Sequence, residues 1–244
     1  MRRLLWILVP VAVLTASRPV LAAGVQGPSG TRVAQALSQD PTLSILGLLA
    51  VLALLPGIIL LMTSFTRIVV VLSLVRTALG LNQVPPNQVL IGLAIFLTLF
   101  VMAPTLSKVE STALTPYLEG KVTVAVAAQR AEVPLKTFLA SGTRQSDLEL
   151  MLNESGQKAP TSVQKIPLAT LVPAYTISQL TLAFEMGVLL FIPFVIIDFI
   201  VASVLMALGM MMVPPTLISL PVKLLLFVLM NGWAMVIQST LAVR

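Results

Sequence analysis

The sequence of 244 residues contains no cysteine and no histidine, and only 10% of its residues are charged. These absences exclude thiolate nucleophiles, imidazole bases, disulfides and zinc sites of the usual kind, and with them most classes of enzyme. We therefore expect no catalytic, cofactor-binding or metal-binding residue. The net charge of +6 does not indicate nucleic-acid binding, because the basic residues are scattered along the chain rather than gathered in a stripe.

Apolar residues are abundant instead, at 57% of the chain, and this composition is typical of a membrane protein. Four apolar stretches follow the N-terminal segment, and each is long enough to cross the roughly 30 Å core of a bilayer as a helix. They cover residues 43–62, 89–106, 188–213 and 217–242. The prolines inside them, Pro56, Pro193 and Pro221, are expected to bend a helix or to mark its end.

The first segment, residues 1–22, has the features of a cleavable bacterial signal peptide. Arg2 and Arg3 precede an apolar run that is too short to span a membrane comfortably, and the small residues Val20 and Ala22 lie before the expected cleavage site. An uncleaved anchor is the alternative. Cleavage would place the new N-terminus outside the cytoplasm.

The remaining chain divides into three segments, which predict an all-α, membrane-associated fold built of helical hairpins. Residues 23–107 hold a first pair of apolar helices and residues 166–244 hold a second pair. Between them, residues 108–165 form a polar segment of nearly balanced charge, predicted to be helical in pieces such as 135–153 and broken near Gly156 and Pro160.

The short segment 63–88 is expected to be a cytoplasmic loop. It carries Arg67 and Arg76 and no acidic residue, and basic loops stay on the cytoplasmic side of a membrane. With four spans, this orientation places the polar segment 108–165 on the periplasmic side, together with both ends of the chain. A cleaved signal peptide agrees with the same orientation.

Met210, Met211 and Met212 stand next to each other shortly before Pro214 and Pro215. Because proline cannot extend a helix, the three methionines are expected in the last helical turn or in the loop that follows it. Successive helical residues point about 100° apart, so at least one methionine should face a partner or a lumen. Ordinary packing at a helix end is the alternative.

Charged side chains within the second apolar pair are Asp198, Glu185 and Lys223. An unpaired carboxylate in such a helix is costly, so Asp198 needs a partner. Lys223 is one candidate, although the expected hairpin register sets Asp198 level with residues 226–230, and a neighbouring subunit is the other. We interpret the three charges as registering subunits rather than as coupling protons, because no partner acid or histidine accompanies them.

Two long motifs, residues 64–105 (SFTRIVVVLSLVRTALGLNQVPPNQVLIGLAIFLTLFVMAPT) and 191–233 (FIPFVIIDFIVASVLMALGMMMVPPTLISLPVKLLLFVLMNGW), resemble the FliP family. FliP is a subunit of the bacterial flagellar type III export gate. The equivalent subunit of virulence-type secretion machines (SctR) is similar over the same motifs but usually lacks a cleavable signal.

The resemblance implies a non-enzymatic role in protein transport, in the inner membrane and the flagellar basal body, with periplasmic exposure. Several copies of the chain would assemble with FliQ-like and FliR-like subunits, and with FlhB-like and FlhA-like proteins, into a conduit for unfolded export substrates. Met210–Met212 align with the methionine-rich gasket of the pore, and Arg67 and Arg76 would contact adjacent subunits. The alternative from another class is a small proton-coupled membrane transporter.

Overall fold

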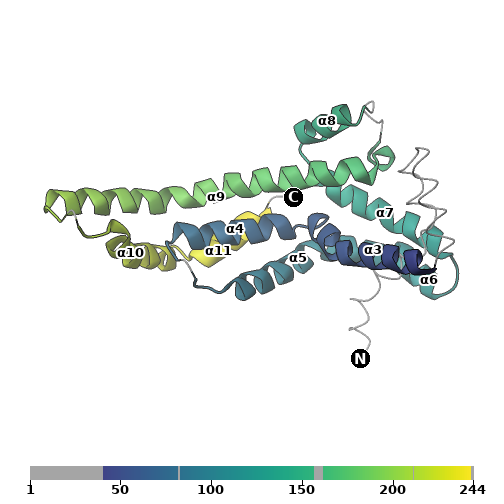
Figure 1. The fold of residues 1–244 in the computed structure, drawn as a ribbon, viewed down its shortest axis with the longest axis horizontal. Coiled ribbons are helices and arrows are strands. Elements are labelled where there is room, and N and C mark those ends of the chain that lie inside the picture. Colours follow the sequence, from purple (N-terminus) through teal and green to yellow (C-terminus); the bar gives the residue numbers. More distant parts are fainter. Residues whose placement is uncertain (1–40, 82, 157–161, 211, 243–244) are drawn as a thin grey trace. The chain divides into compact units, whose positions relative to one another are not determined.

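The computed structural model describes residues 41–81, 83–156, 162–210 and 212–242. The predicted signal peptide, residues 1–22, lies outside these ranges. Within them all regular secondary structure is helical, which confirms the predicted all-α class (Figure 1). In chain order the elements are α3 (Pro41–Leu61), α4 (Phe65–Ala78), α5 (Asn87–Val109), the π-helical turn η2 (Glu110–Leu114), α6 (Thr115–Leu118), α7 (Val124–Ser141), α8 (Gln145–Glu154), the 3₁₀ turn η3 (Val163–Lys165), α9 (Leu168–Ala207), α10 (Pro215–Leu229) and α11 (Gly232–Ala242).

Two continuous helical segments of the described chain are long and apolar enough to cross a membrane. They are Asn87–Leu118, which joins α5 to η2 and α6, and Leu168–Ala207, which is α9. The number rises to four if two pairs of consecutive helices each count as one broken span, Ile45–Leu61 with Phe65–Ala78 and Pro215–Leu229 with Gly232–Ala242. The four predicted apolar stretches therefore correspond to two to four candidate spans.

The described residues form two compact units. One holds α3 up to Leu60 together with residues 104–138, and the other holds residues 61–103 together with the described residues from 139 onward. In the second unit α4 packs against α9 and α11, α8 packs against α9, and α10 runs back beside α9 to form a hairpin with it (Figure 1).

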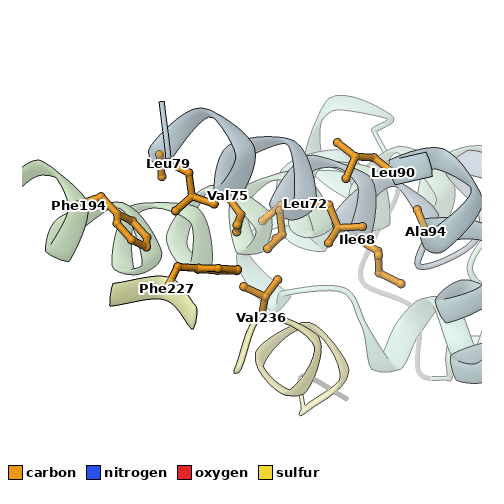
Figure 2. Close-up of a cluster of buried hydrophobic side chains, with 12 residues drawn as sticks. Ile68, Leu72, Val75, Leu79, Leu90, Ala94, Phe194, Phe227 and Val236 are labelled. Atoms are coloured by element: carbon orange, nitrogen blue, oxygen red, sulfur yellow. The ribbon is translucent and has the colours of Figure 1, made fainter. Parts of the chain in front are cut away.

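The core of the second unit is built on one face of α4 (Figure 2). Ile68, Leu72 and Val75 are buried there at the three- and four-residue spacing that lines one side of a helix. They meet buried residues of four other helices: Leu90 and Ala94 of α5, Ala183 and Phe194 of α9, Phe227 of α10 and Val236 of α11.

The prediction of a loop over residues 63–88 is therefore wrong for most of its length. Residues Phe65–Ala78 form α4, a helix of 14 residues. Hydropathy could not detect this helix because it is too short to span a membrane alone and carries two arginines. The apolar stripe that it buries is the signal that would have revealed it.

α9 begins 20 residues before the predicted start of the third apolar stretch and runs for 40 residues. Its first half carries polar side chains such as Ser178 and Gln179, which lower the hydropathy although the helix continues. Pro193 lies inside α9, Pro56 inside α3 and Pro221 inside α10, so none of the three marks a helix end as one reading of them predicted. The remaining helix contacts outweigh the single backbone hydrogen bond that each proline removes.

Turns interrupt the predicted helices at three places. The predicted piece 135–153 is not one helix, because the chain turns at residues 142–144 between α7 and α8. The predicted break near Gly156 is confirmed, since α8 ends at Glu154 and Gly156 has a φ of +65°, whereas Pro160 lies outside the described residues. The last apolar stretch is divided into α10 and α11, which meet at an angle of 65°.

Candidate functional site

The methionine loop, residues 208–214, joins α9 to α10. α9 ends at Ala207, and Gly209 takes the left-handed conformation with φ +74°. The Gly209 N–H donates to the Met206 carbonyl at 3.0 Å and the Met210 N–H donates to the Leu205 carbonyl at 2.9 Å. This pair of bonds is a Schellman cap, which satisfies carbonyls at the end of a helix. Of the two positions predicted for the methionines, the loop is therefore correct for Met210 and Met212.

The described methionine side chains of this loop are both exposed, and Met212 makes almost no contact with the rest of the chain. Met210 is 44% exposed and Met212 is 97% exposed, whereas Met211 lies outside the described residues. Pro214 and Pro215 then start α10, with Pro215 at its first position, where a missing N–H costs nothing. The loop is thus fixed at both ends by its two helices, and Met210 and Met212 are available to another molecule. That they form a gasket stays a prediction.

Asp198 and Lys223 form an ion pair within the hairpin. The Lys223 ammonium donates to Asp198 Oδ2 at 2.6 Å, and the Ser219 hydroxyl donates to Asp198 Oδ1, also at 2.6 Å. Lys223 donates in addition to the carbonyl of Ala78, the last residue of α4, at 3.2 Å. Ser219 and Lys223 are buried, and the Asp198 side chain is partly exposed. Of the two partners expected for Asp198, the structure contains the one in the same chain.

The register of the hairpin differs from the expected one, in which Asp198 lies level with residues 226–230. Asp198 lies nine residues before the end of α9 and Lys223 eight residues after the start of α10, so each is about 12–14 Å from the loop. The expected register assumed a turn centred at residues 212–214. Because Gly209 ends α9 earlier, the turn is centred closer to residues 208–211 and brings Ser219 and Lys223 beside Asp198.

Glu185 does not join this cluster. It forms an ion pair with Arg144, the residue that precedes α8, and both side chains are partly exposed. The same junction holds two further contacts: the Ser178 hydroxyl donates to Asp147 Oδ2 at 2.6 Å, and the Gln179 amide donates to the Gly142 carbonyl at 2.9 Å. Glu185 therefore attaches the α7–α8 turn to α9, and its predicted role in registering subunits stays a prediction.

The two arginines of α4 have different surroundings. Arg67 is only 3% exposed and lies against Tyr175 of α9, so it is a buried helix residue and not a loop charge. Arg76 donates to Asn87 Oδ1 at 2.6 Å and to the Pro85 carbonyl at 3.3 Å, which attaches the end of α4 to the start of α5. The two side chains form no common patch, as their nine-residue spacing predicted.

Sequence analysis missed Ser219, Tyr175 and Gln179. Tyr175 and Gln179 are almost fully buried among apolar helices, and a large polar residue in an apolar segment is a signal that could have identified them. Ser219 carried a weaker signal, its four-residue spacing from Lys223 on one helix face. Among the described residues, His, Cys, Asp and Glu form no group of three or more that could hold a metal ion.

These features define a helical membrane protein with two to four candidate spans, in which Asp198 of α9 and Lys223 of α10 form an ion pair. Comparison with known proteins makes this class more specific. The model of the FliP family matches residues 48–240. The chain therefore belongs to the FliP family, and it is a non-enzymatic membrane component of the flagellar export apparatus.

Individual relatives agree with this assignment. The flagellar biosynthetic protein FliP of Bacillus subtilis (strain 168) is 53% identical over 209 residues, which cover 84% of this chain and 95% of the relative. The protein of the same name from Cereibacter sphaeroides is 49% identical over 201 residues, covering 82% of this chain and 67% of the relative. That from Pectobacterium carotovorum subsp. carotovorum is 49% identical over 203 residues, covering 82% and 79%.

Proposed function

We propose that this chain is a core subunit of the flagellar type III export gate, where it forms part of the conduit for unfolded substrates and closes that conduit between substrates. Several copies assemble with FliQ-like and FliR-like subunits, close to FlhB-like and FlhA-like proteins, in the inner membrane and the basal body. The segment 108–165 is exposed to the periplasm. Segments 23–107 and 166–244 contribute the apolar helices of the assembly.

The observation that carries the proposal is the exposure of the methionine loop in a member of the FliP family. Met212 is 97% exposed and Met210 is nearly half exposed, at the tip of a hairpin whose helices fix both ends of the loop. Methionine is unbranched and flexible, so it adapts to irregular surfaces. A ring of such side chains, one loop from each copy, excludes water and ions by its apolar character and still yields to a passing chain.

The experiment is a permeability measurement on assembled particles in liposomes. Replacing Met210, Met211 and Met212 by Ala removes most of the apolar volume of the ring, so we expect ions and small dyes to leak through the membrane. Native mass measurement of the same sample confirms assembly. The matched control is Met230→Ala, which removes a methionine that is also partly exposed but lies at the opposite end of α10. Unchanged permeability of correctly assembled triple-Ala particles would exclude the seal.

A second triple variant separates apolar character from flexibility. Replacement of the same three residues by Leu keeps the apolar volume but adds branching at Cγ. We expect these particles to stay closed to ions and to export substrates more slowly. A Leu variant that leaks like the Ala variant would mean that the shape of methionine, and not its apolar character, closes the conduit.

The transporter alternative gains no support from the contacts of Asp198. A proton-coupled transporter needs a carboxylate that binds and releases protons during its cycle. Both oxygens of Asp198 already accept hydrogen bonds, from Ser219 and from Lys223. Glu185 forms an ion pair with Arg144 through one of its oxygens.

A further inference from the structure

Asp198 is bound by two donors that come from one face of α10. Ser219 donates to one carboxylate oxygen and Lys223 donates to the other, each at 2.6 Å. The donors are four residues apart, so they lie one helical turn from each other and span the carboxylate along the helix axis. A shift of α10 along α9 by one residue, about 1.5 Å, would move one donor away from its carboxylate oxygen and push the other donor against it, so both bonds would be disturbed. The pair of contacts therefore defines one register of the hairpin.

Lys223 also binds a third helix. Its ammonium donates to the carbonyl of Ala78, at 3.2 Å, and Ala78 is the last residue of α4. The final carbonyls of a helix have no partner within that helix, and a cation near this end is favourable. Lys223 is only 5% exposed, so this contact lies within the packed interface. The Lys223 ammonium thus binds both the end of α4 and Asp198 of α9.

Asp198 and Lys223 lie at nearly the same distance from the methionine loop, about 12–14 Å along α9 and along α10, and Ser219 lies one turn closer to it. Between them and the loop the two helices are continuous among the described residues. A helix transmits a displacement along its axis because each of its turns is hydrogen-bonded to the next. A register shift at Asp198 would therefore move one end of the loop relative to the other.

Neutralisation of a buried lysine is the simpler explanation of the ion pair. It accounts for a carboxylate near Lys223, since a buried charge without a partner is costly. It does not account for Ser219, which is neutral, nearly fully buried and bound to the other carboxylate oxygen. The directional contacts exceed what charge compensation requires.

We propose that Asp198, Ser219, Lys223 and the Ala78 carbonyl form a clasp that fixes the register of α9 against α10 and so positions Met210–Met212 to close the conduit. The clasp lies within one chain, in contrast to the predicted registration between subunits. Ser219 and Lys223 act as positioning residues. The proposal rests on the proposed sealing function of the methionine loop.

Two serine variants give the first test, again as ion leak through assembled particles in liposomes. Ser219→Ala removes one directional bond of the clasp without changing any charge, and we expect a leak above that of the parent. Ser203→Ala is the matched control: Ser203 lies on α9, about as far from the loop as Ser219 lies on α10, but its hydroxyl donates to the Phe199 carbonyl of its own helix and not to Asp198. We expect it to stay closed. If Ser219→Ala and Ser203→Ala were both as impermeable as the parent, the clasp would be overturned.

Charge variants give the second test. Asp198→Asn keeps an acceptor for Ser219 and removes the ion pair, and its leak should exceed that of Ser219→Ala, because it leaves the buried Lys223 ammonium without a charged partner. The double variant Asp198→Asn with Lys223→Met contains no unpaired charge, so it should assemble like the parent and still leak. Restored sealing in the double variant would reduce the role of Asp198 to charge compensation. A sealed Asp198→Asn particle that fails to export would assign it proton chemistry instead, and either result would overturn the clasp.

A direct measurement of register separates this proposal from the function on which it rests. The chain has no cysteine, so one cysteine at Val204 of α9 and one at Leu225 of α10, both exposed positions, can carry spin labels. The distance between the two labels then reports the register. Cysteines of partner chains are replaced, and labelled copies are diluted with unlabelled ones. We expect one narrow distance distribution in the parent and in Ser203→Ala, and a broadened or shifted one in Asp198→Asn. An unchanged distribution would overturn the clasp whatever the methionine variants do. A changed distance distribution in Asp198→Asn, together with particles of the Met210–Met212 triple-Ala variant that do not leak, would refute the seal. The clasp would then still fix the register of the hairpin.

Discussion

At the scale of single residues, Gly142 shows how closely the turn between α7 and α8 lies against α9. Its carbonyl accepts the Gln179 amide, and a Cβ at this position would lie 2.7 Å from Cε2 of Tyr175 and 3.1 Å from Nε2 of Gln179. The first distance is shorter than real Cβ contacts allow. The Tyr175 ring is nearly fully buried and has no free space to move into.

We therefore expect Gly142→Ala to lower the free energy of unfolding by about 1–3 kcal/mol, the usual cost of overpacking. Thermal unfolding of the purified protein in detergent measures this change. Gly92→Ala is the matched control, because the same methyl group on α5 would meet no heavy atom within 4 Å. In a helix interior Ala is favoured over Gly by about 0.5–1 kcal/mol, so this variant should be slightly stabilised. Equal unfolding temperatures of the two variants would contradict the packing argument.

Single residues could be predicted where their chemistry conflicts with their surroundings. Asp198 and Lys223 were identified because a charge in an apolar helix needs a partner, and each is the partner of the other. Ser219 could not be identified in this way, because serine in a helix often bonds to its own backbone and carries no conflict. Arg67 was assigned to a loop because hydropathy cannot distinguish an arginine in water from one buried against Tyr175.

At the scale of elements, Asn231 divides the last apolar stretch into α10 and α11. It has a φ of +49°, the left-handed conformation that asparagine tolerates better than most residues other than glycine. The following Gly232 lies so close to Phe227 that a Cβ there would be 2.3 Å from its ring. The break thus places Phe227 between Phe194 and Trp233, with ring centroids 6.3 Å and 5.4 Å away.

Substitution at Asn231 tests this account of the break. Asn231→Val should destabilise the protein by about 1–2 kcal/mol, since a β-branched residue disfavours the left-handed conformation, whereas Asn231→Gly should change stability by only a few tenths of a kcal/mol. Asn153→Val in α8, an exposed asparagine without a positive φ, should also be nearly neutral. Chemical denaturation of the three variants gives the comparison. An Asn231→Val variant as stable as the parent would mean that packing, and not backbone conformation, sets the break.

Elements could be predicted where the signal was local and strong. The helix end near Gly156 followed from residue type, and Gly156 has a positive φ. The break at Asn231 did not, because nothing in a continuous apolar run indicates which residue leaves the helix. The first half of α9 and all of α4 were missed for a different reason: they are held by contacts with each other, and the hydropathy of either segment does not reveal tertiary contacts.

At the scale of the whole molecule, the described chain leaves much of its apolar surface uncovered. On α9 the side chains of Leu189 and Phe199 are each 69% exposed, and Leu74, Phe184 and Phe199 line an apolar groove of about 380 Å³. A soluble monomer rarely exposes so many large apolar side chains next to one another. Lipid and partner subunits would cover it equally well, so hydropathy could predict that the helices are apolar but not what they face. Only the two long motifs could indicate an assembly, through their resemblance to a family.

The mass of the particle extracted in mild detergent, after expression with its neighbouring membrane genes, tests the assembly that the proposed function requires. We expect a single large particle with several copies of this chain and other small membrane proteins, because one methionine loop cannot surround a conduit and because the exposed face of α9 needs partners. Gly142→Ala at a temperature where it is folded provides a control for general instability. A stable monomer or dimer, under conditions that preserve other membrane complexes, would contradict the gate. That result would favour the small transporter, and Asp198 would be the residue to study, because without several copies there is no ring of methionines for the clasp to position.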